Sequence, residues 1–168
     1  MTNAPNGNGS ATQALDENQQ PNAQLQVMTQ YIKDLSFENP NIEKLIENPG
    51  DQPELAIEVN VTGKKVGEHV FESGIEFTGK ASNDTGMLYT IELVYAGLFQ
   101  LNNIPTKSLE AVLLVNCPML LFPYMRRIIA DITREGGFPP LALDPIDFAA
   151  LYMSNKKAGS VATSKADD

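Results

Sequence analysis

The sequence holds a single cysteine, Cys117, a single histidine, His69, and no tryptophan. One cysteine cannot close an internal disulfide, which fits a reducing compartment and favours a cytoplasmic protein. One histidine and one cysteine also fall short of the usual zinc ligand sets, and the phosphate-loop pattern GxxxxGKS or GxxxxGKT is absent. We therefore expect neither a metal nor a nucleotide cofactor.

A catalytic set is equally hard to assemble. Nucleophilic catalysis needs a nucleophile beside a base that a third group orients. His69 is expected on the inward face of a strand, where a structural role is the commoner case. Cys117 is expected at the start of a helix, which favours the thiolate, but no base lies near it in the sequence. The sequence thus favours a binding protein over an enzyme.

Long hydrophobic runs and excess positive charge are missing as well. The longest apolar runs, such as residues 111–115 and 119–122, fall far short of the roughly 20 residues that span a bilayer. The first ten residues lack the basic start and apolar run of a signal peptide. Asp and Glu number 21 against 12 Lys and Arg, giving a net charge of -9 that repels nucleic acid and anionic lipid. We expect a soluble protein that neither binds nucleic acid nor inserts into a membrane.

Composition divides the chain of 168 residues into three parts. Residues 1–24 are rich in Asn, Gln, Gly, Ala and Pro, which predicts a disordered arm. Residues 25–153 carry most of the large apolar side chains and form one domain with an ordinary core. Residues 154–168 are small and charged, which predicts a flexible tail.

Alternating apolar and polar residues predict β-strands in the first half of the domain. The expected strands cover residues 25–38, 55–62, 69–78 and 87–99. A hairpin turn at 63–67 is expected to join the second strand to the third. The order of the runs predicts four antiparallel strands.

The alternation also assigns side chains to faces. Asp34 and Glu38 lie on the face opposite Tyr31 and Phe37, because residues four apart in a strand point the same way. In the last strand, Thr90 and Glu92 oppose a largely apolar set. Such carboxylates are usually solvated surface, and a docking patch is the sharper alternative.

Residues 116–134 predict an amphipathic helix with one apolar stripe. Asn116 is expected to cap its start, and glycines 136 and 137 to end it. Pro123 inside this stretch predicts a bend, or a regular helix that begins there. Shorter helices are expected at 42–46 and 106–115.

A last helix is expected after Asp144, which would cap it with Pro145 at its first position. Strands first and helices after indicate an α+β fold, a four-stranded antiparallel sheet with helices packed on one face. The aromatic and Met side chains exceed what such a sheet buries, which indicates an apolar groove or an interface.

Five motifs stand out along the chain: YIKDLSFENP at 31–40, GLF at 97–99, CPMLLFPYMR at 117–126, GFPPL at 137–141 and DPIDF at 144–148. In this order they resemble the SecB family of bacterial protein-export chaperones. The resemblance covers residues 25 to about 153 and leaves out both tails.

The resemblance implies a homotetramer, built as a dimer of dimers, without cofactors or enzyme activity. Members of the family hold precursor proteins unfolded in apolar grooves and deliver them to the SecA ATPase for export through the Sec translocon.

The resemblance also implies two sets of site residues. The SecA-binding positions match Asp34, Glu38, Thr90 and Glu92. The candidates for the client groove are Phe122, Tyr124, Phe138, Leu141, Tyr31, Phe37, Tyr89 and Phe99. Thr90 departs from the apolar residue usual in the family, and Asp51 stands where some relatives carry a tryptophan.

Three other interpretations remain open. A SecB-like chaperone dedicated to a toxin–antitoxin pair would prefer one client. A small-ligand enzyme acting on acyl groups would need a carboxylate inside the apolar cleft. A plain oligomeric scaffold would use its apolar surface for assembly alone.

Overall fold

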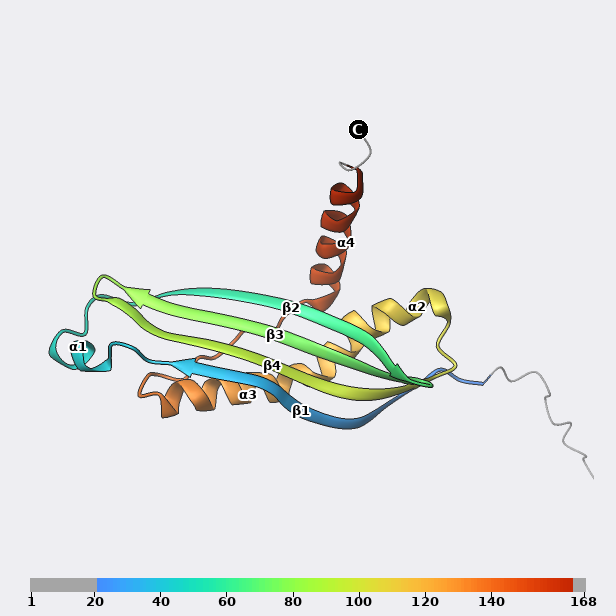
Figure 1. The fold of residues 1–168 in the computed structure, drawn as a ribbon, viewed down its shortest axis with the longest axis horizontal. Coiled ribbons are helices and arrows are strands. Elements are labelled where there is room, and N and C mark those ends of the chain that lie inside the picture. The colour runs from blue at the N-terminus through green and yellow to red at the C-terminus, as the bar shows by residue number, and fades with distance from the viewer. Residues whose placement is uncertain (1–20, 165–168) are drawn as a thin grey trace, which may run out of the picture.

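The computed structural model describes residues 21–164 and confirms the α+β fold (Figure 1). The predicted arm lies largely, and the end of the predicted tail wholly, outside the described residues. The elements are β1 (Gln24–Glu38), α1 (Ile42–Glu47), β2 (Glu54–Gly67), β3 (Val70–Asn83), β4 (Gly86–Asn102), α2 (Thr106–Ala111), the π-helix η1 (Val112–Asn116), α3 (Cys117–Glu135) and α4 (Phe148–Ser164).

The four strands form one antiparallel sheet in the order β1-β4-β3-β2. Strands β1 and β2 are therefore the two edges, and the connection containing α1 crosses one end of the sheet (Figure 1). Because β1 and β2 each have only one neighbour within the chain, both edges present unpaired backbone groups.

The hairpin turn predicted at 63–67 is wrong. Strand β2 continues through Gly67, and the chain turns at Glu68 and His69 instead. The polar residues pair with β3, where Lys64 lies opposite Glu72 and forms an ion pair with it. His69 is exposed and has a φ of 56°, so it marks the turn and does not face the core.

Helices cover one face of the sheet, which we call the inner face; the other is the outer face. Gly97 allows this close packing, because a Cβ atom there would lie 3.0 Å from Leu121 Cδ2. Near the far edge, a Cβ on Gly63 would lie 3.2 Å from the side chains of Leu113 and Leu114. The sheet and the helical segment thus meet where the strands carry little bulk.

The core lies between the inner face and α3. Its completely buried side chains include Ile75, Ile91 and Phe99 from the sheet and Leu121, Met125 and Ile129 from α3. Burying one such side chain contributes roughly 1.5–3 kcal/mol, so this layer supplies most of the stabilisation. The predicted apolar stripe of the helix is the stripe that packs here.

The start of the predicted amphipathic helix differs from expectation. Asn116 has helical dihedral angles and no side-chain cap, because α2, η1 and α3 run on as one helical segment. Because Pro118 lacks an N–H, it cannot donate a hydrogen bond to a carbonyl of the preceding turn. The Leu113 carbonyl, a buried acceptor in the π-helix, accepts a hydrogen bond from the Ser73 hydroxyl at 2.8 Å instead.

Helix α3 includes Pro123 and ends as predicted. Gly136 follows its last residue, and Gly137 takes a φ of 88°, which glycine adopts without strain. By length and composition alone, Thr106–Glu135 is long and apolar enough to span a membrane. In the fold, its buried side chains pack on the sheet of the same chain.

The predicted cap of the last helix is wrong. Helix α4 begins at Phe148, and the Ala150 N–H donates to Asp147 Oδ1 at 2.9 Å, so Asp147 does what Asp144 was expected to do. The Tyr152 hydroxyl donates to Glu110 Oε2 at 3.1 Å and ties α4 to α2. The helix continues to Ser164, beyond the domain end predicted at residue 153, and projects from the body (Figure 1).

Candidate functional site

The outer face brings the four predicted SecA-binding residues together. In the β1–β4 register, Asp34 lies opposite Val94, Ser36 opposite Glu92, and Glu38 opposite Thr90. Residues opposite each other in a sheet point to the same face. We call Asp34, Glu38 and Glu92 the acidic face; all three are exposed. Thr90 lies among them, half-buried, with its hydroxyl 3.7 Å from Met87 Sδ.

Two β-bulges in β1 decide which of its side chains reach this face. The register shifts between Val27 and Thr29, and again between Ile32 and Asp34. Tyr31 consequently lies opposite Ala96, on the outer face. The prediction that Tyr31 shares a face with Phe37 is wrong, because strict alternation ignores the extra residue that a bulge inserts.

Glu72 gathers three side chains on the outer face. Lys33 Nζ lies 2.7 Å and Lys64 Nζ 3.3 Å from Glu72 Oε1, and the Tyr31 hydroxyl donates to Glu72 Oε2. We call these four residues the Glu72 clasp. Donation from Lys33 and then from Tyr31 lowers the pKa of Glu72 to about 2, whereas burial, followed by the Glu72 contact, raises the pKa of Tyr31 to about 12. The clasp therefore joins β1 to β3 across β4, and Lys64 adds a contact from the neighbouring strand β2.

An aromatic cluster lies at one end of the inner face. The rings of Phe37 and Tyr89 stack at 5.7 Å between centroids, and Tyr89 meets Phe138 at 4.9 Å. Phe37 and Phe138 are half-buried, whereas Tyr89 is buried, and this burial raises its pKa. The cluster thus joins β1 and β4 to the loop that follows α3.

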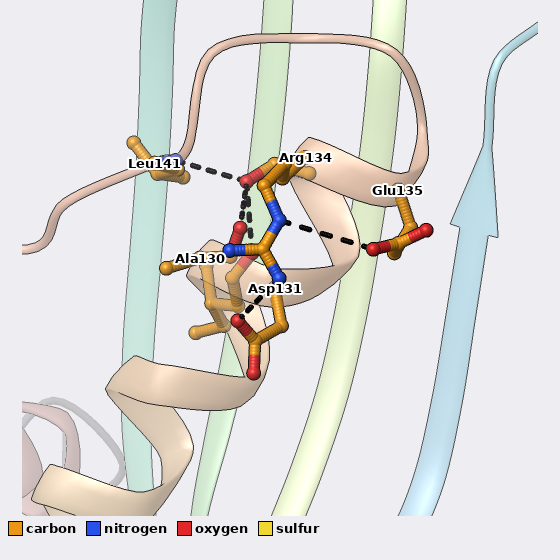
Figure 2. A network of polar contacts seen from close by, with 7 residues as sticks. Ala130, Asp131, Arg134, Glu135 and Leu141 are labelled. Carbon is orange, nitrogen blue, oxygen red and sulfur yellow. Dashed lines mark hydrogen bonds and ion pairs between the residues drawn. The ribbon is translucent and has the colours of Figure 1, made fainter.

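That loop is fixed to the last turns of α3 through Thr133, which is completely buried. The Leu141 N–H donates to Thr133 Oγ1 at 2.9 Å, and the threonine hydroxyl donates to the Ile129 carbonyl at 2.9 Å (Figure 2). The Phe138 N–H also donates to the Thr133 carbonyl at 3.1 Å. Two of these hydrogen bonds reach the loop and hold Phe138 and Leu141 in place, and both side chains remain half-buried.

The remaining groove candidates differ in accessibility. Phe99 is completely buried and belongs to the core, while Phe122 is 8% exposed and packs edge-on against Phe148 at 5.9 Å. Tyr124, in contrast, is 48% exposed on α3. Of the predicted groove residues on the inner face, Phe37, Tyr124, Phe138 and Leu141 are accessible in the single chain.

Further exposed apolar side chains lie on edge strand β1 and on α3. Ile32 and Leu35 pair with Tyr95 and Leu93 on the inner face of edge strand β1, yet both remain largely exposed. On α3 the exposed apolar side chains are Met119, Leu120 and Tyr124. We call these five residues the apolar flank. The adjacent apolar pairs in the β1 sequence, residues 27–28 and 31–32, are the signal that could have revealed it.

Cys117 is not placed to act as a nucleophile in this arrangement. Its side chain is completely buried, and burial raises the pKa of its thiol to about 12. Within residues 21–164, no group of three or more His, Cys, Asp or Glu side chains is placed to hold a metal ion. What the described chain offers is therefore two chemically different surfaces on opposite sides of one sheet.

Comparison with known proteins agrees with this arrangement. The family described as "Preprotein translocase subunit SecB" matches residues 16–159. The chain belongs to the SecB family. A protein-export protein SecB of Rhodopseudomonas palustris is 43% identical over 163 residues, covering 97% of this chain and 96% of the relative. One from Afipia carboxidovorans is 48% identical over 132 residues, covering 79% and 82%.

The fold has a counterpart among solved structures. A SecB-like chaperone of Mycobacterium tuberculosis, in complex with a peptide from an antitoxin, matches 73% of this chain and 90% of its own with a TM-score of 0.60. Its sequence is 18% identical, so this likeness concerns the fold alone. Membership in SecB makes the chain a protein-export chaperone that binds unfolded preproteins, and the family is not one of enzymes.

Proposed function

We propose that this SecB chain works in the cytoplasm as a dimer of dimers that carries unfolded precursors on its inner side and docks SecA on its outer face. The observation that carries the proposal is the separation of the two surfaces. The acidic face is polar and exposed, whereas the aromatic cluster of Phe37, Tyr89 and Phe138 lies on the opposite side of the sheet.

The acidic face suits a basic docking partner. Asp34, Glu38 and Glu92 lie on adjacent strands, so their charges act on the same approaching surface. The net charge of -9 adds a long-range attraction for a basic protein. Exposed charges are screened by salt, so docking through them should weaken as ionic strength rises.

The aromatic cluster suits an extended apolar client. Phe138 and Leu141 offer half-buried apolar surface on a loop that is hydrogen-bonded to Thr133, and Phe37 of β1 adds a third half-buried side chain. An extended chain can place apolar side chains against such a surface while water or nearby polar groups meet its backbone. This mode tolerates many client sequences, as an export chaperone requires.

The apolar flank suits assembly of identical chains. Its five side chains are each between 39% and 57% exposed and lie on the sheet edge and on α3. Exposed apolar surface of this kind commonly marks an interface. An edge strand with unpaired backbone groups favours contact along β1, and α3 offers a second contact, as a dimer of dimers requires.

The test of client binding is the refolding of a denatured precursor with the purified protein present. We expect the protein to slow refolding, and Phe138→Ala with Leu141→Ala to lose most of this effect. Pro140→Ala, an exposed position in the same loop, is the control. A protein that slows no unfolded chain would refute client holding, and activity toward one client alone would favour a dedicated chaperone.

The test of docking is the affinity for purified SecA. Asp34→Lys and Glu92→Lys should each weaken SecA binding without changing client holding. Glu68→Lys makes the same change of charge at the β2–β3 turn and serves as the control. If all three variants weaken SecA equally, net charge and not the acidic face governs the contact.

A further inference from the structure

The bulge at Lys33 sets the direction in which Asp34 points. Ile32 lies opposite Tyr95 on the inner face, and Asp34 lies opposite Val94 on the outer face. Tyr95 and Val94 are consecutive, whereas Ile32 and Asp34 have one residue between them. If β1 kept a regular register after Ile32, with no bulge, Lys33 would lie opposite Val94 and Asp34 would turn toward the helices.

The inserted residue is held by Glu72. The Lys33 ammonium group lies 2.7 Å from Glu72 Oε1, and the glutamate side chain is only 13% exposed. Tyr31, two residues before Lys33, donates its hydroxyl to the other oxygen of the same carboxylate. Glu72 thus grips β1 within two residues of the bulge.

Small residues of the two central strands make this reach across the sheet possible. Ala96 of β4 lies between Tyr31 and Gly74 in the register, so a shallow floor separates β1 from Glu72. The resulting hollow measures about 410 Å³ and is bordered by Lys33, Asp34 and Glu72. A Cβ on Gly74 would lie 3.0 Å from Thr62 Oγ1, so a larger residue at this position would crowd the Thr62 side chain.

We propose that the Glu72 clasp is a positioning device that holds the Lys33 bulge and thereby presents Asp34 on the outer face for SecA. Lys33 and Glu72 are positioning residues, and Asp34 makes the contact. The inference rests on the proposed docking of SecA at the acidic face. It gives Lys33 a function, although the positive charge of this lysine alone would lower the negative charge of the acidic face.

Lys33→Ala separates positioning from charge, because the two predict opposite signs. Removing a positive charge from an acidic surface should strengthen binding of a basic partner if charge alone acts. If the clasp positions Asp34, the same change weakens SecA binding several-fold. Isothermal titration with SecA measures the difference, and client holding should stay unchanged.

Glu72→Gln provides a second variant with a matched control. Glu76 borders the same hollow and accepts a hydrogen bond from Asn60 at 3.0 Å; its charge acts on Lys33 through space, but among the described residues it forms no hydrogen bond or ion pair with the clasp. Glu76→Gln removes the same charge from the same face without releasing the bulge. We expect Glu72→Gln to weaken SecA binding several-fold more than Glu76→Gln does.

A direct readout of the bulge does not depend on SecA. In the wild type, nuclear Overhauser contacts should join the Asp34 side chain to the Val94 methyl groups, and Lys33→Ala and Glu72→Gln should lose them. Contacts retained in both variants, or tighter SecA binding by Lys33→Ala, would overturn the positioning role. If wild-type protein does not bind SecA, the docking proposal fails, and the Overhauser contacts still decide whether the clasp holds the bulge.

Discussion

Glu72 shows how a single carboxylate can organise an edge strand. Three donors from β1 and β2 converge on it, so it is held ionised at a position that is mostly shielded from water. Sequence alone gave no reason to single out this glutamate among its neighbours in β3. Its partners lie 41, 39 and 8 positions away, and only the sheet register brings them together.

The lowered pKa of Glu72 makes a prediction about stability in acid. The pKa falls from 4.5 to about 2 in the folded chain, so the clasp contributes stability that is fully present above about pH 4.5. This contribution is lost as the pH falls through about 2. Urea unfolding at several pH values should therefore show wild type more stable than Glu72→Gln at neutral pH, with a gap that closes in acid. A gap independent of pH would contradict the ion pairing.

Cys117 makes a second prediction at the residue scale. Complete burial and a pKa near 12 leave almost no thiolate at neutral pH. A thiol reagent should therefore label the folded chain far more slowly than the urea-unfolded chain. Labelling at similar rates in both states would show that α3 opens readily from the sheet.

At the scale of elements, the contact between α3 and the sheet depends on Gly97. A Cβ atom there would lie 3.0 Å from Leu121 Cδ2 and 3.1 Å from both the Thr29 carbonyl oxygen and Phe99 Cε2. Gly97→Val should therefore cost about 1–3 kcal/mol of unfolding free energy by overpacking. Chemical denaturation measures it, with Gly67→Ala as the control, because the nearest side-chain atom there lies at 3.5 Å. An equal loss in both variants would show that the contact with Leu121 is not the cause, because the lost freedom of glycine in the unfolded chain stabilises the fold and cannot lower its stability.

Regular periodicity was sufficient to predict most of the elements. In β4, which pairs with β3, the alternation correctly put Thr90 and Glu92 on the face opposite the buried apolar side chains. These two strands pair with each other along almost their whole length and shift register only near their turn, so a period of two holds.

The errors fell where an inserted residue or a remote partner decides the local structure. The β1 bulges move Tyr31 to the other face, and a π-helix replaces the expected cap at Asn116. Each includes a contact with a residue far along the chain, Glu72 in the first case and Ser73 in the second. A pattern confined to neighbouring residues carries no record of such contacts.

At the scale of the whole molecule, the apolar flank predicts that the chain assembles with further copies of itself, which would cover these exposed side chains. Leu120→Glu places a charge on an exposed apolar position of α3, so the fold should survive while assembly weakens. Sedimentation should show a smaller species than the wild type, with an unchanged circular dichroism spectrum. Arg126→Glu, also exposed on α3, is the charge control. A wild-type protein that sediments as a single chain would contradict the proposed assembly.

A one-layer sheet leaves very little material between the proposed client surface and the proposed SecA surface. Phe37 and Glu38 are consecutive, as are Tyr89 and Thr90, and in each pair one side chain faces the aromatic cluster and the other the acidic face. One peptide unit is the whole thickness that separates the two surfaces. A substitution at either member can shift its neighbour's backbone, so mutants at these pairs are not orthogonal reporters, and distant positions such as Leu141 separate the two activities more cleanly.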